Sequence, residues 1–193
     1  MRIAVLGSGT GSNFAALSQA CMDGRIQGKI VIVGSDQPEA AILAKAEALE
    51  IPTFFEEGGK DFSERVTKRL IDAEVELVCL AGLIRLIKEP MLGRFPNRIL
   101  NIHPSLLPKY PGKEAWKQAL GDGANETGCT VHFVDKGIDT GEVILQEVVP
   151  IHENDTPRLL HARIQKAENR VYVEAVRCLT ADQLTVGSSF TPP

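Results

Sequence analysis

Short apolar runs alternate with stretches of helical periodicity along the first half of the chain. The first run, RIAVLG, ends at a glycine-rich loop, as a buried parallel strand often does. We predict strands over residues 2–7, 29–35, 51–55, 75–82 and 98–103, and helices over 12–23, 40–49 and 61–72. This order predicts an α/β fold: a doubly wound, mostly parallel, Rossmann-like sheet with right-handed connections and helices on both faces.

The second half of the chain changes its pattern after a short predicted helix over 115–120. Two stretches with period-two alternation, 127–134 and 142–149, follow each other through a Gly-rich turn and predict antiparallel strands at a sheet edge. A long helix over 156–181 closes the pattern. We therefore predict one domain over 1–186 and a frayed tail over 187–193.

Composition narrows the class of protein. The chain has 193 residues, 44% of them hydrophobic, and a net charge of -4, which does not suggest a nucleic-acid-binding protein. No apolar run approaches the ~20 residues of a membrane span, and no signal peptide is visible. The four cysteines form no C-x-x-C pair, so we expect no metal site and a reducing, cytoplasmic location. We expect a monomer or a weak homodimer.

The loop GSGTGSN, residues 7–13, lies after the first predicted strand, where sheets of this kind bind ligands. Glycines and a helix N-terminus together suit a phosphate group. The spacing G-x-G-x-G differs from the dinucleotide fingerprint, although Asp36 follows the second strand where a ribose-binding acid would lie. A third interpretation is a plain turn, capped by Ser12 or Asn13.

A polar pair marks the end of the fifth predicted strand. Asn101 and His103 share one face of the strand, and their donors suit a developing oxyanion, as in acyl transfer. Three prolines follow and restrict the loop behind them. The alternative is a buried, hydrogen-bonded histidine with no catalytic role. A carboxylate such as Asp135 or Asp139 near the ring would raise the pKa of His103, although Asp139 also reads as an ordinary turn residue.

Five motifs together resemble the phosphoribosylglycinamide formyltransferases, a folate-dependent family. They are GSGTGSN, LAGLIRLI, ILNIHPSLLPKYPG, GCTVHFVDKGIDTG and ARIQKAENRVY, in that order over about 180 residues. The resemblance implies transfer of a formyl group from N10-formyltetrahydrofolate, the cosubstrate, to the amine of a ribonucleotide in purine synthesis. It implies no metal, no nucleic acid and no membrane partner.

The resemblance also implies a role for each matching position. Asn101 and His103 would stabilise a tetrahedral intermediate, and Asp139 would raise the pKa of His103 and keep the ring charged. The phosphoribosyl substrate would meet Gly11, Ser12, Asn13, Gln165, Lys166, Ala167 and Glu168. The folate would meet Ile84, Arg85, Leu86, Ile87, Asn101, Asp135, Lys136, Gly137, Ile138 and Asp139. A cis peptide is implied at Leu107–Pro108.

The chain departs from the family pattern at three places, one of which is Ser35-Asp36, where the family usually has Ser-Asn after the second strand. Ser63 stands where the family often has an arginine near the folate tail, with Lys60 and Arg65 as the basic neighbours. KEAW, with Lys113 and Trp116, replaces a histidine-containing run.

Several rivals remain open beside the glycinamide ribonucleotide branch. A formyltetrahydrofolate hydrolase would carry a domain in front, and a methionyl-tRNA formyltransferase would carry a larger, basic C-terminal domain. A sugar-nucleotide formyltransferase differs only in its acceptor. Outside this class stand a nicotinamide-dependent reductase and a non-catalytic nucleotide-binding module.

Overall fold

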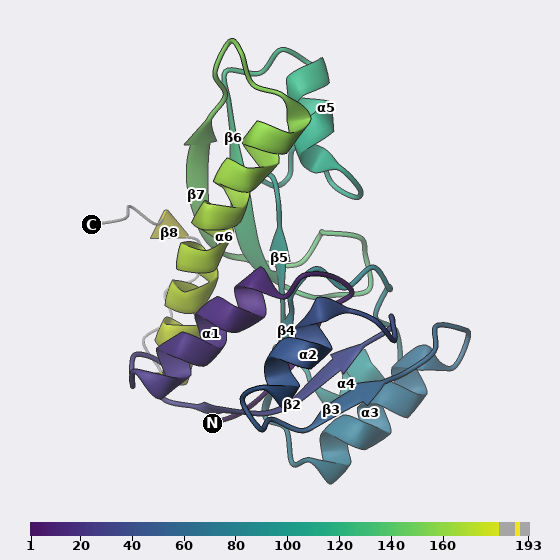
Figure 1. The fold of residues 1–193 in the computed structure, drawn as a ribbon. Coiled ribbons are helices and arrows are strands. Elements are labelled where there is room, and N and C mark those ends of the chain that lie inside the picture. Colours follow the sequence, from purple (N-terminus) through teal and green to yellow (C-terminus); the bar gives the residue numbers. More distant parts are fainter. Residues whose placement is uncertain (182–187, 190–193) are drawn as a thin grey trace. The chain divides into compact units, whose positions relative to one another are not determined.

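A computed structural model of the chain describes residues 1–181 and 188–189, and these form two compact units. Unit 1 covers Met1–Asn101 and unit 2 begins at Ile102. Unit 1 alternates strands and short helices (Figure 1). Its elements are β1 (Arg2–Leu6), α1 (Ser12–Met22), β2 (Lys29–Ser35), α2 (Ala41–Glu47), β3 (Thr53–Phe55), α3 (Phe62–Asp72), β4 (Leu77–Leu80), α4 (Met91–Arg94) and the first part of β5 (Ile99–His103).

The strands of unit 1 form a parallel sheet in the order β3-β2-β1-β4-β5. The two central strands are apolar on both faces: Ile3 to Leu6 in β1 and all of β4 are buried. Such continuous burial explains why these strands read as unbroken apolar runs instead of alternating ones. The strand order reverses at β1, so the loops after β1 and β4 leave neighbouring strands at the same edge.

Helices cover both faces of this sheet. The chain moves outward from β1 to β3 through α1 and α2, which contact each other, and returns through α3 and α4, which also contact each other. Because parallel crossovers are right-handed, the reversal of direction places the two pairs on opposite faces. In α1 the face toward the core includes Phe14 and Leu17, both fully buried.

Unit 2 is built on an antiparallel hairpin. It contains α5 (Ala115–Gly121), β6 (Glu126–Phe133), β7 (Val143–Pro150), α6 (Pro157–Thr180) and the short β8 (Ser188–Ser189). Strands β6 and β7 are antiparallel neighbours, and α6 packs on both. Thr156 caps α6: its hydroxyl accepts a hydrogen bond from the Leu159 N–H, and Pro157 occupies the first turn.

The predicted fold class is confirmed, including the antiparallel portion near the C-terminus. The predicted strands and helices all occur, most of them shorter by one to three residues at an end than predicted. The helix α4 was missed, because four residues carry no readable period and only Met91 is buried. Much of the predicted tail, residues 187 and 190–193, lies outside the described residues, whereas Ser188–Ser189 pair with Leu145 and Gln146 of β7.

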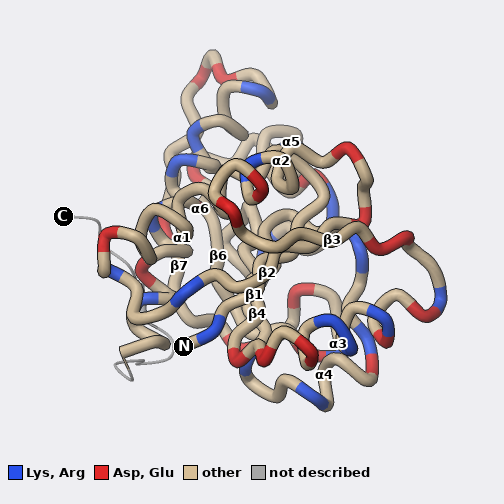
Figure 2. The backbone as a smooth tube through the Cα atoms, turned by 60° about the horizontal axis from the view of Figure 1, so that its bottom comes forward, with Lys and Arg blue, Asp and Glu red and all other residues tan. Residues whose placement is uncertain are grey.

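Charge is spread along the chain. Figure 2 shows acidic and basic positions distributed over strands, helices and loops, and among the helices α2, α3 and α6 carry residues of both signs. Among the described residues, no helix has the length and apolar character that crossing a membrane would need.

Gly11 is a position in unit 1 where a side chain should be poorly tolerated. Its φ is +71°, and a Cβ atom there would lie 2.9 Å from three atoms of Ile42. We expect Gly11→Ala to lower the free energy of unfolding by about 1–3 kcal/mol, measured by urea denaturation. Gly9→Ala is the matched control, because a Cβ there meets nothing within 4 Å. Equal stability of the two variants would contradict this account.

Candidate functional site

The loop after β1 delivers backbone N–H groups at the start of α1. Gly11 is the N-cap residue, in the left-handed conformation, and no side chain caps the helix. The interpretation of Ser12 or Asn13 as a side-chain cap is therefore wrong; both lie in the first turn, and Asn13 is buried. The start of α1 carries the partial positive charge of a helix N-terminus, which favours an anion.

The loop after β4 presents apolar side chains beside the loop after β1. Ile84 is 64% exposed and Leu86 is 56% exposed, whereas Ile87 is buried. The Ile84 N–H donates to the hydroxyl of Ser8 at 2.8 Å, and the Ser8 N–H donates to the Gly82 carbonyl at 3.2 Å. The two loops predicted to bind different substrates are therefore joined within unit 1.

The carboxylate of Asp36 is occupied by hydrogen bonds from other residues of the protein. Its side chain is fully buried and accepts hydrogen bonds from the Ser8 hydroxyl, from Arg85 Nε at 2.8 Å and from Gln37 Nε2 at 3.2 Å. Burial alone would raise the pKa of Asp36, but these donors hold it below its ordinary value. A carboxylate so occupied is not open to a ribose hydroxyl, so the dinucleotide hypothesis loses its acidic residue.

The basic residues considered for the folate tail differ in their surroundings. Arg65 pairs with Glu56 at 2.6 Å, and Arg69 contacts the same carboxylate at 2.9 Å. Ser63 is buried, and its hydroxyl accepts from the Lys88 N–H at 3.0 Å, which ties α3 to the end of the loop after β4. Lys60 is exposed.

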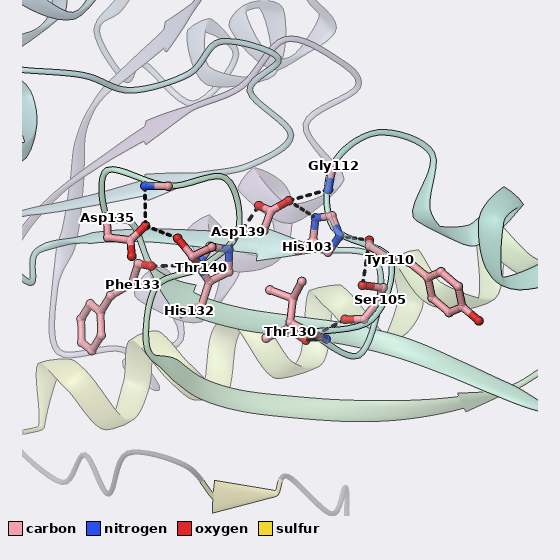
Figure 3. Close-up of polar contacts among 12 residues, drawn as sticks. His103, Ser105, Tyr110, Gly112, Thr130, His132, Phe133, Asp135, Asp139 and Thr140 are labelled. Atoms are coloured by element: carbon pink, nitrogen blue, oxygen red, sulfur yellow. Dashed lines mark hydrogen bonds and ion pairs between the residues drawn. The ribbon is translucent and has the colours of Figure 1, made fainter.

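His103 lies at the end of β5 and is surrounded by polar groups (Figure 3). Its Nδ1 atom is 3.3 Å from Asp139 Oδ2, and its Nε2 atom is 2.8 Å from the Tyr110 carbonyl oxygen. The Gly112 N–H donates to the same Asp139 oxygen at 2.8 Å. Of the two acidic residues considered, the structure brings Asp139 to the ring, as the resemblance implied.

The protonation of His103 is set by opposing effects. Both ring nitrogens face acceptors, which only the doubly protonated ring satisfies with two N–H donors. Burial of the ring nevertheless lowers the pKa of His103 below its ordinary value, although the Tyr110 carbonyl and Asp139 act to raise it. Burial therefore opposes the effect of Asp139, which acts to raise the pKa of His103 as the resemblance implied.

Asp139 is held in an unusual backbone conformation, with φ at +54°. Aspartate tolerates this left-handed region better than most residues do, and such positions are common at functional sites. Burial would raise the pKa of Asp139, but His132, the Gly112 N–H and His103 together keep it below its ordinary value. Asp139 is thus an anion over the neutral pH range.

The rest of the loop from Asp135 to Asp139 closes on itself. Asp135 accepts hydrogen bonds from the Gly137 N–H at 2.9 Å and from the Thr140 hydroxyl at 2.8 Å. Asp135 therefore shapes the turn and is not the partner of His103. Ile138 is 55% exposed, and Lys136 is also exposed.

His132 is a site residue that the sequence analysis missed. Its Nε2 atom is 3.6 Å from Asp139 Oδ1, its Nδ1 atom is 2.8 Å from the Phe133 carbonyl oxygen, and the side chain is buried. The β6–β7 register shifts between Val131 and His132, an irregularity of the kind that re-aims a side chain near a site. The feature of the sequence that could have identified His132 is its place at the end of a predicted strand, just before the loop that carries Asp139.

The loop after β5 is clamped by the hairpin. The Thr130 hydroxyl donates to the Ser105 carbonyl at 2.6 Å and accepts from the Leu107 N–H at 3.0 Å. Gln146 Nε2 donates to the Leu107 carbonyl at 2.9 Å. The implied cis peptide at Leu107–Pro108 is present. Hydrogen bonds from β6 and β7 therefore fix the loop together with the prolines.

Other predicted site residues lie in β5 and in α6. Asn101 lies in β5, two residues before His103 on the same strand face, and is paired in register with Leu80. On α6, Ala167 and Glu168 are buried, Gln165 is half-buried and Lys166 is exposed. Nothing within residues 1–181 or 188–189 groups three or more histidine, cysteine or acidic side chains as metal ligands would be.

Trp116, a departure from the family pattern, stacks on His161 of α6. The ring centroids are 3.9 Å apart and the ring planes differ by 8°. This contact joins α5 to α6 and buries part of both rings.

The chain thus has a doubly wound α/β fold, and a histidine–carboxylate pair lies at the end of one of its strands. Residues 1–176 match the sequence pattern of a known family described as formyl transferase. Because this match covers most of the length of the chain, the chain belongs to the formyl transferase family.

Three known proteins illustrate the similarity. A phosphoribosylglycinamide formyltransferase of Bacillus subtilis is 39% identical over 92% of this chain and 94% of its own length. The crystal structure of glycinamide ribonucleotide transformylase 1 from Symbiobacterium toebii superposes with a TM-score of 0.94 at 44% identity, over 98% of this chain and 92% of that one. A trifunctional purine biosynthetic protein of Drosophila melanogaster is 45% identical over 92% of this chain, which spans 14% of that protein's length.

The opposing effects of burial and of Asp139 on the pKa of His103 can be measured. We expect His103 to titrate below about 6.5, the ordinary histidine pKa, and to titrate lower still in Asp139→Asn, because the attraction of the carboxylate is lost while burial remains. Proton and nitrogen NMR of the imidazoles gives both midpoints. His161, whose pKa is lowered by burial alone, serves as the unchanged internal reference. A higher His103 midpoint in the variant would contradict the role of Asp139.

Proposed function

We propose that the chain transfers the formyl group of N10-formyltetrahydrofolate to the amine of N1-(5-phospho-D-ribosyl)glycinamide, a step of de novo purine synthesis. The observation that carries the proposal is the His103–Asp139 pair, 3.3 Å apart, at the end of β5 in a formyl transferase chain. Both substrates are small molecules. A cytoplasmic location agrees with the four free cysteines.

The reaction begins when the primary amine attacks the formyl carbon. A C–N bond forms, and negative charge develops on the formyl oxygen. Asn101 and His103 donate hydrogen bonds to this oxygen, an effect that typically contributes about 3–4 kcal/mol per donor. The bond to folate N10 then breaks, and one proton passes from the attacking nitrogen to N10 through a water molecule.

The lowered pKa of His103 determines at which stage of the reaction the ring becomes charged. The ring is largely uncharged before the reaction, because burial opposes the imidazolium. An oxyanion forming beside the ring raises its pKa, so that, together with Asp139, it favours uptake of a proton from solvent water by the ring as the intermediate appears. The interaction is therefore stronger in the transition state than with bound substrate, which is the condition for raising kcat.

The Tyr110 carbonyl competes for the ring proton in the substrate-free protein. Nε2 donates to this oxygen, and Nδ1 faces Asp139. To donate to the formyl oxygen, the Nε2–H must therefore give up its hydrogen bond to the Tyr110 carbonyl oxygen or donate to both oxygens at once.

The remaining predicted residues take binding roles in this proposal. Gly11, Ser12 and Asn13 bind the phosphoribosyl group through the start of α1. The exposed loop Ile84–Ile87 binds the pterin, and Asp135–Asp139 also lies along the folate. The ribonucleotide also meets Gln165–Glu168 of α6.

Release of tetrahydrofolate tests the reaction directly. The purified protein is incubated with N10-formyltetrahydrofolate, with and without the ribonucleotide amine, and tetrahydrofolate is followed by absorbance. We expect release only when the amine is present. Release without any amine would instead indicate a hydrolase, release only with an amino sugar nucleotide would indicate a different acceptor, and no release at all would overturn the proposal.

Substitutions separate chemistry from binding. His103→Ala and Asp139→Ala should abolish turnover while both substrates still bind, and Asn101→Ala should lower kcat by about 10²-fold or more, as the loss of one oxyanion donor does. His152→Ala is the matched control, because His152 lies exposed in the turn before α6. Steady-state kinetics and calorimetric binding give the two readouts. Near-normal kcat in both the His103 and Asp139 variants would refute the assignment.

A further inference from the structure

Ser8 links two loops of unit 1 through a single hydroxyl group. The hydroxyl donates to Asp36 Oδ1 and accepts from the Ile84 N–H at 2.8 Å. A serine hydroxyl has one proton, so its direction decides which side of the oxygen offers lone pairs. Because Asp36 accepts this proton, the lone pairs face Ile84, and the backbone of the loop after β4 is oriented accordingly.

Asp36 holds the second loop at a further point. Its other oxygen accepts from Arg85 Nε at 2.8 Å, and the carboxylate is fully buried. The Arg85 guanidinium lies directly over Gly58, where a Cβ atom would collide with it. Burial makes the pair sensitive to the loss of either partner, since an unpaired buried charge is costly.

We propose that Asp36 is a positioning residue that couples the phosphate-binding loop, residues 7–13, to the pterin-binding loop, Ile84–Ile87, so that each substrate favours the binding of the other. This inference rests on the proposed function for the identity of the two substrates. A ligand that orders residues 7–13 also fixes the Ser8 hydroxyl, which is the acceptor for the Ile84 N–H. A pterin bound to the other loop fixes the Ile84 N–H, which is the donor. By linkage, each ligand must change the affinity for the other by the same factor.

Asp36→Asn and Ser8→Ala test the coupling. The asparagine keeps the size of the side chain and one acceptor oxygen, so it cannot satisfy both Ser8 and Arg85. The Ser8 variant removes the link itself and tests the proposal independently if the first variant folds poorly. Gln37→Ala is the matched control, because Gln37 also donates to Asp36, at 3.2 Å, but belongs to neither loop.

Calorimetry measures the Kd of the ribonucleotide amine with and without saturating tetrahydrofolate, a pair that cannot react. In the unaltered protein and in Gln37→Ala we expect tetrahydrofolate to tighten this binding about fivefold or more, the usual scale of coupling between sites. In Asp36→Asn and Ser8→Ala the factor should fall below about twofold. In Asp36→Asn the KM for formyl folate should rise with kcat nearly unchanged, which a general loss of structure would not produce.

The outcomes separate this inference from the function on which it rests. Failure of the unaltered protein to bind or use the two substrates would overturn the proposed function. Normal turnover with equal coupling in all four proteins, or with no coupling in the unaltered protein, would overturn the role of Asp36 alone. Thermal unfolding of each variant checks that its fold is kept.

Discussion

The arrangement of the candidate site depends on one carboxylate. Asp139, in a left-handed turn, faces two buried imidazoles, His103 at 3.3 Å and His132 at 3.6 Å, and accepts the Gly112 N–H. Its charge compensates part of the cost of burying polar rings, and its position decides how the His103 ring is oriented. Other parts of unit 2 support this contact: His132 lies in β6, Asp139 lies in the loop that joins β6 to β7, and Thr130 and Gln146 hold the loop that carries Tyr110 and Gly112.

Burial and charge act against each other at His103, and this opposition gives the site its chemistry. A carboxylate beside an exposed histidine would leave the ring protonated at neutral pH. Here desolvation lowers the pKa of the ring, so the charged form becomes favourable only when a second negative charge appears beside it. In the proposed reaction a developing oxyanion supplies this charge, so the burial that weakens the resting imidazolium would strengthen the differential binding of an intermediate.

Unit 1 uses the same principle with a different outcome. Asp36 is also a buried carboxylate, but its partners are Arg85 and Ser8, which are donors under all ordinary conditions. A carboxylate with fixed donors organises backbone and does not titrate in the neutral range. The residue that the sequence suggested as a ribose ligand is therefore a structural link between loops, and burial, which a sequence does not display, is the deciding difference.

The sequence by itself determined the succession of strands and helices except α4, the glycine-rich loop before α1, and the Asn101–His103 pair on one strand face, because periodicity and backbone sterics act over a few residues. Family motifs then pointed to Asp139 among the candidate acids. Only the tertiary structure brought His132 to the site, turned Asp135 into a turn residue, occupied Asp36 and lowered the pKa of His103. These four outcomes depend on contacts between segments far apart in the chain and on the exclusion of water, and no local pattern encodes either.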